Sequence, residues 1–268
     1  MPPALDESSS STSMIPIFRV FSSTEELKNS LGSYIADMAD ASIEARGTFL
    51  LATSGGSLPA TLAASLCGVV ASGRDLRTEA WVLIYVDERH VALDAPDSNH
   101  GATVSALAGV DWWRARIVPI EPALPLDACA AAYNRALAVE LEKAGGAIDL
   151  VVLGMGPDGH TASLFPGHPL VSGDGSNALV AAIADSPKPP AARVTLTLSA
   201  LRAAHNVAFV ACGTDKALAL AAVASTDAAS HGPDALPAAR VHARGKPAVF
   251  FTDTGGASMM AAAKKDTL

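Results

Sequence analysis

The sequence predicts a single α/β domain: a doubly wound, mostly parallel β-sheet with helices on both faces. Two observations predict it. Short apolar runs rich in Val, Ile, Leu and Phe recur along the chain, and longer Ala- and Leu-rich segments of helical period separate most of them. Strands joined by helix-length connections pair in parallel, and continuously apolar strands are typical of a sheet buried on both faces.

The expected elements of the N-terminal half alternate in this way. Strands are predicted where β-branched or aromatic residues cluster, at 17–21 (IFRVF), 48–53 (TFLLAT), 80–86 (AWVLIYV) and 116–120 (RIVPI). Segments with apolar residues at helical spacing predict helices near 24–45, 58–70, 98–108 and 127–144.

The C-terminal half continues the series with strands at 148–154 (IDLVVLG), 178–184 (ALVAAIA), 193–198 (RVTLTL), 206–212 (NVAFVAC) and 248–251 (AVFF). One further helix is predicted near 215–223. The Pro- and Gly-rich stretches 166–176 and 186–190 are each followed by a strand-like run, so we interpret them as loops within the domain.

The first 14 residues, MPPALDESSSSTSM, are interpreted as a disordered polar tail, which leaves 15–268 as the single α/β domain. The tail has no basic region followed by an apolar one and is not Arg-rich, so neither a signal peptide nor a transit peptide is expected. No apolar stretch approaches the roughly 18 residues of a membrane span. We therefore expect a cytoplasmic protein that does not cross a membrane.

The charge and the cysteines exclude several classes of function. With 27 acidic and 19 basic residues, the net charge is -8, which argues against a nucleic-acid partner. Cys67, Cys129 and Cys212 are far apart and lie in apolar patterns, so they are expected to be reduced core thiols. No pair of histidines has the spacing of zinc ligands, and no metal is expected.

The segment VVLGMGPDGHTASLFPG (151–167) matches the dinucleotide-binding pattern G-x-G-x-x-G at Gly154, Gly156 and Gly159. The strand-like run that ends at Asp185 is the best support for NAD binding, because that fold places an acidic residue about 20 residues later. However, a proline and two glycines soon after His160 leave no room for the crossover helix. We therefore expect no nucleotide cofactor.

Pro157, Asp158 and His160 also stand where a pyrophosphate would need bare backbone N–H groups. We instead interpret the glycines as a tight turn that points Asp158 and His160 into a cleft. The ordinary pKa of a histidine side chain is about 6.5, so His160 is suited to proton transfer near neutral pH. Asp158 could orient His160 or hold a substrate. The alternative is that His160 merely caps a helix.

Four polar segments follow predicted strands: SGGS (54–57), DERH (87–90), GPDGH (156–160) and GTDK (213–216). Because open α/β sheets bind ligands at the carboxyl ends of their strands, the four segments are expected to converge. Gly55, Gly56 and Ser57 lie between a strand and a helix, a position that suits phosphate capture by backbone N–H groups.

Two charged residues, Asp87 and Arg89, follow directly after a buried strand. Their position fits a role in a ligand-binding site and a solvent-exposed turn equally well. For Glu88 and His90 the solvated turn is preferred. Lys216 lies in the first turn of a predicted helix, where the helix dipole disfavours a cation unless an anion is near. Arg193 is the first residue of a strand-like segment. It is expected either to bind the same anion or to pair with a carboxylate on the protein surface.

Together these segments resemble the 6-phosphogluconolactonase family, within a wider group that includes glucosamine-6-phosphate deaminases. Most of the chain is covered, and the most specific piece is GMGPDGHTASLFPG. The chain departs from the family at Ala92, where proline is usual, and at Phe251, where tryptophan is common. The matching pieces are SGGSLPA, VDERHV followed by Ser98-Asn99, LGMGPDGHTASLFPG, RVTLTL, GTDKALAL, LPAARV and FFTD.

The resemblance implies a Rossmann-like fold without a nucleotide cofactor and hydrolysis of 6-phospho-D-glucono-1,5-lactone, the second step of the oxidative pentose phosphate pathway. It implies that His160 is the general base and that Asp87 and Asp158 face the sugar. The implied ligands of the phosphate are the Ser57 loop, Arg193 and Lys216, with Arg89 as a further partner. The expected partner is thus a phosphorylated sugar lactone, and the expected state is a monomer or weak homo-oligomer.

Three other functions are weighed against this one. Deaminases and isomerases of the same fold usually place a glutamate shortly after the histidine, where this chain has Phe165. A sugar-phosphate sensor without turnover would have no use for the pair Asp158 and His160. A serine hydrolase would need a G-x-S-x-G elbow, which the sequence lacks.

Overall fold

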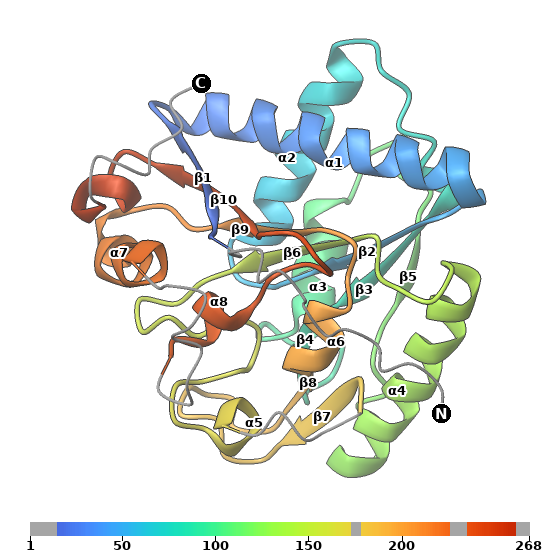
Figure 1. The fold of residues 1–268 in the computed structure, drawn as a ribbon. Helices are drawn as coiled ribbons and strands as arrows, with labels where there is room; N and C mark the ends of the chain where they lie inside the picture. The colour runs from blue at the N-terminus through green and yellow to red at the C-terminus, as the bar shows by residue number, and fades with distance from the viewer. Residues whose placement is uncertain (1–14, 173–177, 226–234, 261–268) are drawn as a thin grey trace, which may run out of the picture.

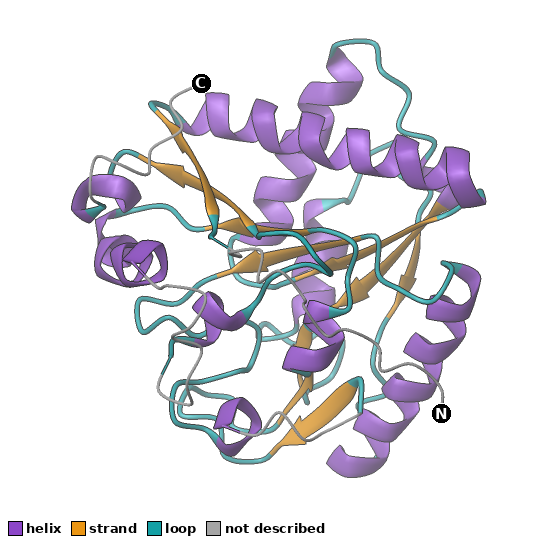
Figure 2. Ribbon diagram, in the orientation of Figure 1, coloured by secondary structure: helices purple, strands orange, loops and turns teal. Residues whose placement is uncertain are grey.

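The computed structural model describes residues 15–172, 178–225 and 235–260. The polar tail expected at 1–14 lies outside the described residues. Strands form a twisted central layer with helices above and below it (Figure 2). The two-faced α/β arrangement predicted from the sequence is therefore confirmed.

The main sheet contains seven strands, all parallel, in the order β1-β10-β9-β6-β2-β3-β5. Each lies within or within two residues of a predicted strand. In chain order they are β1 (Ile17–Phe21), β2 (Phe49–Thr53), β3 (Trp81–Tyr85), β5 (Arg116–Val118), β6 (Leu150–Gly154), β9 (Val207–Val210) and β10 (Val249–Asp253).

The direction of winding changes between the neighbouring strands β2 and β6. From β2 the chain proceeds to β3 and β5 on one side, whereas from β6 it proceeds to β9 and β10 on the other. Loops that leave two such strands diverge to opposite faces and open a crevice at the carboxyl edge, where open α/β sheets bind their ligands. The SGGS and GPDGH segments are these two loops.

Helices α1 (Thr24–Arg46) and α2 (Leu58–Ala71) cover one face of the main sheet (Figure 1). The length of α1 follows from its sequence. The hydroxyl of Ser23 accepts a hydrogen bond from the backbone N–H of Glu26, and Gly47 ends the helix in the left-handed conformation at φ 76°. Leu27, Leu31 and other apolar residues at helical spacing are buried against the strands.

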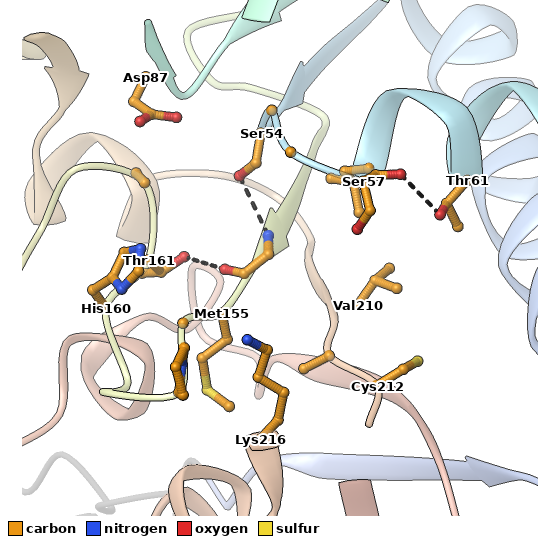
Figure 3. Close-up of a pocket in the computed structure, with 18 of the residues that line it drawn as sticks. Ser54, Ser57, Thr61, Asp87, Met155, His160, Thr161, Val210, Cys212 and Lys216 are labelled. Carbon is orange, nitrogen blue, oxygen red and sulfur yellow. Dashed lines mark hydrogen bonds between the residues drawn. The ribbon is translucent and has the colours of Figure 1, made fainter. Parts of the chain in front are cut away.

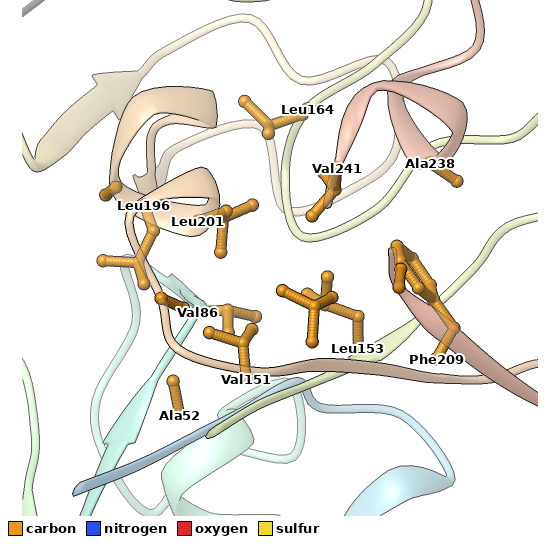
Figure 4. Packing of buried hydrophobic residues seen from close by; sticks show 14 of the residues in the cluster. Ala52, Val86, Val151, Leu153, Leu164, Leu196, Leu201, Phe209, Ala238 and Val241 are labelled. Carbon is orange, nitrogen blue, oxygen red and sulfur yellow. The ribbon is translucent and has the colours of Figure 1, made fainter. Parts of the chain in front are cut away.

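The opposite face packs against a larger set of elements. Alternate residues of each strand point to the two faces, so Leu51 and Val152 contact the α1 side while Ala52, Val151 and Leu153 contact the other (Figure 4). The helices that bury residues on this second side are α4 (Leu126–Lys143), α6 (Leu198–Arg202), α7 (Ala217–Ser225) and α8 (Pro237–Arg240).

The remaining short helices join these layers. They are α3 (Asn99–Ala106), α5 (Pro169–Ser172) and the 3-10 turns η1 (Thr78–Ala80), η2 (Thr214–Lys216) and η3 (Gly256–Met259). Within the described residues, the helix between the glycine segment and β7 is α5, a single turn.

A second, three-stranded antiparallel sheet lies beside this face, in the order β4 (Asp87–Arg89), β8 (Arg193–Leu196) and β7 (Val180–Ile183). The sequence predicted the last two as strands but not their separate sheet, and it predicted a loop in place of β4. The connection from β7 to β8 is short and rich in proline, with no room for a crossover helix. Strands joined in this way pair antiparallel.

Within the described residues, no helix combines the length and the apolar character needed to cross a membrane. The same part of the chain contains no group of three or more His, Cys, Asp or Glu side chains placed to hold a metal ion. All three cysteines are free. The expectation of a core thiol is confirmed for Cys129, which is buried, and is wrong for Cys67 and Cys212, which are exposed.

Candidate active site

A cavity of about 480 Å³ lies at the carboxyl ends of β2, β6 and β9. Its size suits a small ligand. Residues from all four polar segments line it, and Figure 3 shows Ser57, His160 and Lys216 around the same space. The predicted site residues that line it are Gly55, Gly56, Ser57, Asp87, Arg89, His160, Arg193 and Lys216. Asp158 is not among the lining residues and contacts His160 instead.

The glycine segment after β6 forms the tight turn expected from its sequence. The N–H of Gly159 donates to the carbonyl of Gly156 at 2.9 Å, and the N–H of Gly156 donates to the carbonyl of His160 at 2.9 Å. Gly159 has φ 76°, which favours glycine. At Gly156, an added Cβ would lie 2.0 Å from the Nδ1 of His160. Both glycines are thus required by the turn and its histidine.

The turn places the His160 ring between a carboxylate and an aromatic ring. Nδ1 of His160 lies 2.5 Å from Oδ1 of Asp158, and the ring stacks on Phe165 with centroids 4.8 Å apart. Burial disfavours the ionised form of Asp158, but the hydrogen bond from His160 and the nearby positive charges outweigh it and lower the pKa to about 2. An ionised Asp158 assigns the proton to Nδ1 and leaves Nε2 as an acceptor.

The environment also keeps the His160 ring uncharged. Burial lowers the pKa of His160, the hydrogen bond and charge of Asp158 oppose this, and the charge of Lys188 adds to the lowering. The net pKa lies below the ordinary 6.5. At neutral pH the imidazole is therefore neutral, and its Nε2 can accept a proton.

Lys188 is a site residue that the sequence did not reveal. Its Nζ lies 3.2 Å from Nδ1 of His160 and 3.3 Å from Oδ2 of Asp158. In the sequence it stands inside the Pro-rich stretch SPKPP, which indicated only a loop. The sequence shows only that this lysine lies among prolines, shortly before the strand that begins at Arg193. No nearby residue pattern indicated that it contacts His160.

The SGGS loop forms the other side of the cavity, at the start of α2. An added Cβ on Gly55 would lie 1.7 Å from Oδ1 of Asn99, and Gly56 has φ 68°. The hydroxyl of Ser54 accepts a hydrogen bond from the N–H of Gly154 at 3.3 Å, which ties this loop to β6. The loop thus presents backbone close to the cavity, and its use as an anion site stays a prediction.

Lys216 closes this part of the cavity from the end of η2. Its Nζ lies 2.9 Å from Oδ2 of Asp215, and the side chain is mostly buried, with 20% exposed. Asp215 itself is largely exposed. The ammonium of Lys216 therefore pairs with a solvated carboxylate and is directed into the cavity with Ser57 (Figure 3).

Arg193 lines the cavity, but its guanidinium contacts are with the protein. Nε donates to the carbonyl of Pro190 at 3.0 Å, Nη2 to that of Lys188 at 2.9 Å, and Nη1 to the hydroxyl of Ser163 at 3.3 Å. The carboxylate near it is Asp87, with Nη1 and Oδ2 3.8 Å apart. Asp87 is buried, so the surface carboxylate that the sequence offered as one partner is instead an internal one.

Asp87 and Arg89 lie on β4, at the wall of the cavity. Asp87 accepts a hydrogen bond from the hydroxyl of Ser163 at 2.7 Å. Arg89 donates from Nη1 to the carbonyl of Asp97 at 2.9 Å. Its Nε is buried and has no hydrogen-bond partner within the described part of the chain. Arg89 thus lines the cavity, but its unpaired Nε is itself shielded from solvent.

The interpretation of Glu88 and His90 as a solvated turn is wrong. Glu88 is 1% exposed, and its carboxylate accepts hydrogen bonds from the N–H groups of Arg89, Asn99 and His100, each at 2.7 Å. His90 is half-buried, with Nε2 2.9 Å from the carbonyl of Leu124. Burial raises the pKa of Glu88, while the backbone donors at the start of α3 oppose that rise. Local sequence could not show that α3 folds back on this strand.

Replacing Glu88 by alanine is expected to lower the free energy of unfolding by about 3 kcal/mol or more, because several buried N–H groups would lose their acceptor. Urea denaturation measures this loss. Glu44→Ala, at an exposed position of α1, is the control and is expected to change stability by less than about 0.5 kcal/mol. Equal midpoints for the two variants would show that the Glu88 contacts contribute nothing.

Comparison with known proteins shows the family of this chain. Residues 22–250 match the family model described as glucosamine-6-phosphate isomerases/6-phosphogluconolactonase. A 6-phosphogluconolactonase of Rattus norvegicus is 39% identical over 249 residues, which cover 91% of this chain and 93% of the relative. One of Homo sapiens is 37% identical with the same coverage.

Solved structures give the same result at lower identity. The 6-phosphogluconolactonase of Thermotoga maritima matches with a TM-score of 0.70 and 25% identity, covering 89% of this chain and 99% of that one. The 6-phosphogluconolactonase of Trypanosoma brucei matches with a TM-score of 0.72 and 25% identity, covering 92% of this chain and 99% of that one. A monomeric glucosamine-6-phosphate deaminase shares the fold, with a TM-score of 0.72, 19% identity and coverage of 91% and 99%.

Proposed function

The chain belongs to the glucosamine-6-phosphate isomerase/6-phosphogluconolactonase family, in its 6-phosphogluconolactonase branch, and we propose that it hydrolyses 6-phospho-D-glucono-1,5-lactone with His160 as the general base. The activity is that of a lactone hydrolase of the pentose phosphate pathway. One observation carries the proposal for the base. Asp158 holds Nδ1 of His160, so that Nε2 remains an acceptor in a cavity that Lys216 also lines.

In the proposed reaction, Nε2 of His160 takes a proton from water as the water oxygen bonds to the lactone carbonyl carbon. The tetrahedral intermediate then collapses, and the bond from this carbon to the ring oxygen breaks. The imidazolium returns its proton to the departing ring oxygen, which restores the neutral imidazole and leaves the free carboxylic acid. This acid loses its proton to water and gives 6-phospho-D-gluconate. Asp158 keeps the ring oriented through both steps and stabilises the imidazolium.

The oxyanion of this intermediate needs hydrogen-bond donors. Arg89, which lines the cavity, and the backbone N–H groups of the glycine segment are the candidate donors. Asp87, held by Ser163, is proposed to accept from sugar hydroxyls, since an ionised carboxylate is an acceptor only.

The phosphate is proposed to bind at the Gly55–Ser57 loop and Lys216. A loop of backbone N–H groups before α2 and a nearby ammonium match the charge and the acceptors of a phosphate. Arg193 is proposed to hold Lys188 and Asp87 in place and not to bind the phosphate itself, because each guanidinium nitrogen already donates to a protein oxygen. The net charge of -8 does not oppose binding at contact, because charges beyond about 8 Å are screened.

The test is to compare two reactions of the purified protein. Lactone hydrolysis, measured as a rate above the spontaneous background, is expected, and ammonia release from glucosamine 6-phosphate is not. Phe165, stacked on His160, supplies no carboxylate for ring opening. Ammonia release with lactone hydrolysis at background would favour the deaminase instead.

The expected cytoplasmic location and monomeric or weakly oligomeric state stay predictions.

Replacing Lys216 by methionine is expected to raise KM for the phosphorylated lactone and to lower kcat/KM by about ten- to a hundredfold, since a hydrogen bond between charged groups is lost. The effect on kcat is expected to be smaller. Lys246→Met removes an exposed lysine outside the cavity and is the control. An unchanged KM in Lys216→Met would exclude Lys216 as a phosphate ligand.

A further inference from the structure

The Nδ1 side of His160 faces two charged groups, although the proposed chemistry uses only one of them. Asp158 lies 2.5 Å from Nδ1 and Lys188 lies 3.2 Å from it. We propose that Lys188 is a positioning residue of this site: its ammonium pins the Asp158 carboxylate beside Nδ1 and opposes a second proton on the ring, so that Nε2 is free when substrate arrives. This inference rests on the proposed role of His160.

The backbone of Lys188 is fixed on both sides, which distinguishes it from an ordinary surface lysine. Its carbonyl accepts hydrogen bonds from Nη2 of Arg193 at 2.9 Å and from the hydroxyl of Ser186 at 2.8 Å. Its N–H donates back to the hydroxyl of Ser186 at 3.3 Å. The buried guanidinium of Arg193 therefore holds the loop that carries Lys188 to the catalytic pair.

The positions of the three groups allow one arrangement of protons. Nδ1 has room for a single proton, which lies between it and the ionised Asp158. Lys188 cannot donate to Nδ1 in that state, so its ammonium pairs with Oδ2 of Asp158, 3.3 Å away. If Lys188 did donate to Nδ1, the proton of the neutral His160 ring would have to lie on Nε2. A lone pair of the Asp158 carboxylate would then face the lone pair of Nδ1. The acidic neighbour excludes this second arrangement.

The charges that face His160 come from several elements and act in opposite directions. Asp158, on the same turn, and Asp87, on β4, favour the imidazolium. Lys188, from the loop before β8, opposes it, as does burial of the ring. Arg89 and Lys216 line the same cavity with positive charge. Lys188 is the cation in contact with the ring, so its removal shifts the balance toward the imidazolium.

The rate–pH profile tests this inference in Lys188→Met and Lys188→Gln, which remove the charge, and in Lys188→Arg, which keeps it. Below its pKa His160 is protonated and cannot act as a base, so kcat/KM falls as pH decreases. In the neutral variants this acidic limb is expected to move to higher pH by about half to one unit. Lys188→Arg and the control Lys246→Met are expected to keep the wild-type limb. Coinciding limbs in all variants would overturn the proposal.

A titration of the protein without substrate separates this inference from the proposed reaction. Nitrogen-15 NMR of the His160 ring, assigned by comparison with His160→Ala, gives the protonation midpoint directly. A higher midpoint in Lys188→Met and Lys188→Gln supports the role of Lys188 even if the wild-type protein fails to hydrolyse the lactone. Equal midpoints overturn that role even if the wild-type protein does hydrolyse it.

Discussion

Replacing His160 by alanine is expected to lower kcat for lactone hydrolysis by about two to four orders of magnitude, the usual contribution of a general base. The ring lies beside the cavity with Nδ1 committed to Asp158, so its loss removes the group proposed to take the proton from water. The Gly55–Ser57 loop and Lys216 are unaffected. The variant is therefore expected to bind 6-phosphogluconate with nearly wild-type affinity.

The measurement is the hydrolysis rate above the spontaneous background, together with product affinity by calorimetry. His205→Gln provides a matched control, because His205 is half-buried but does not line the cavity. It is expected to keep wild-type kcat. A near-wild-type rate in His160→Ala would show that another group is the base, and loss of product binding would indicate a more general structural role.

Replacing Gly156 by alanine is expected to lower kcat by about a hundredfold without removing any catalytic group. The added Cβ would lie 2.0 Å from Nδ1 of His160 and 2.4 Å from Oδ1 of Asp158. The ring cannot yield easily, because Phe165 is stacked against it and Asp158 holds its Nδ1. It must leave its position, and a displacement of about 1 Å in an active site can cost this much rate.

The backbone of Gly156 is not in the left-handed region, so alanine is expected to be tolerated by the turn itself. Gly154→Ala is the matched control, because a Cβ there meets no other atom within 4 Å. It is expected to lower kcat much less. If Gly156→Ala keeps wild-type kcat while His160→Ala does not, the ring position in this structure is not the one used in catalysis.

Much of the fold was predictable because a parallel strand that is buried on both faces has a continuous run of apolar residues in the sequence. The run LVVL (150–153) is apolar at every position, since alternate residues pack on opposite faces of the sheet. The small antiparallel sheet was not predicted as a unit. Its strand β4 is the charged sequence Asp87–Arg89, and it pairs with β8 far along the chain. Pairing between distant segments leaves no local pattern.

The site was predictable to a similar extent. Polar residues that follow buried strands converge at the carboxyl edge of the sheet, and the cavity contains residues of all four such segments. Glu88 was misinterpreted because a charged residue after a strand is usually solvated, whereas here the start of α3 supplies it with buried donors. Lys188 was missed because its partners belong to another loop.

The local sequence was enough to establish the strands of the main sheet, the edge that carries the crevice and the glycine turn that presents His160. These features depend on residue spacing and on the steric freedom of glycine, which act over a few neighbouring residues. Tertiary packing alone established that Glu88 is buried, that Arg193 holds the loop of Lys188, and that this lysine stands beside the proposed base. Those contacts join segments distant in the chain, and their free energies depend on burial, which exists only once the domain is folded.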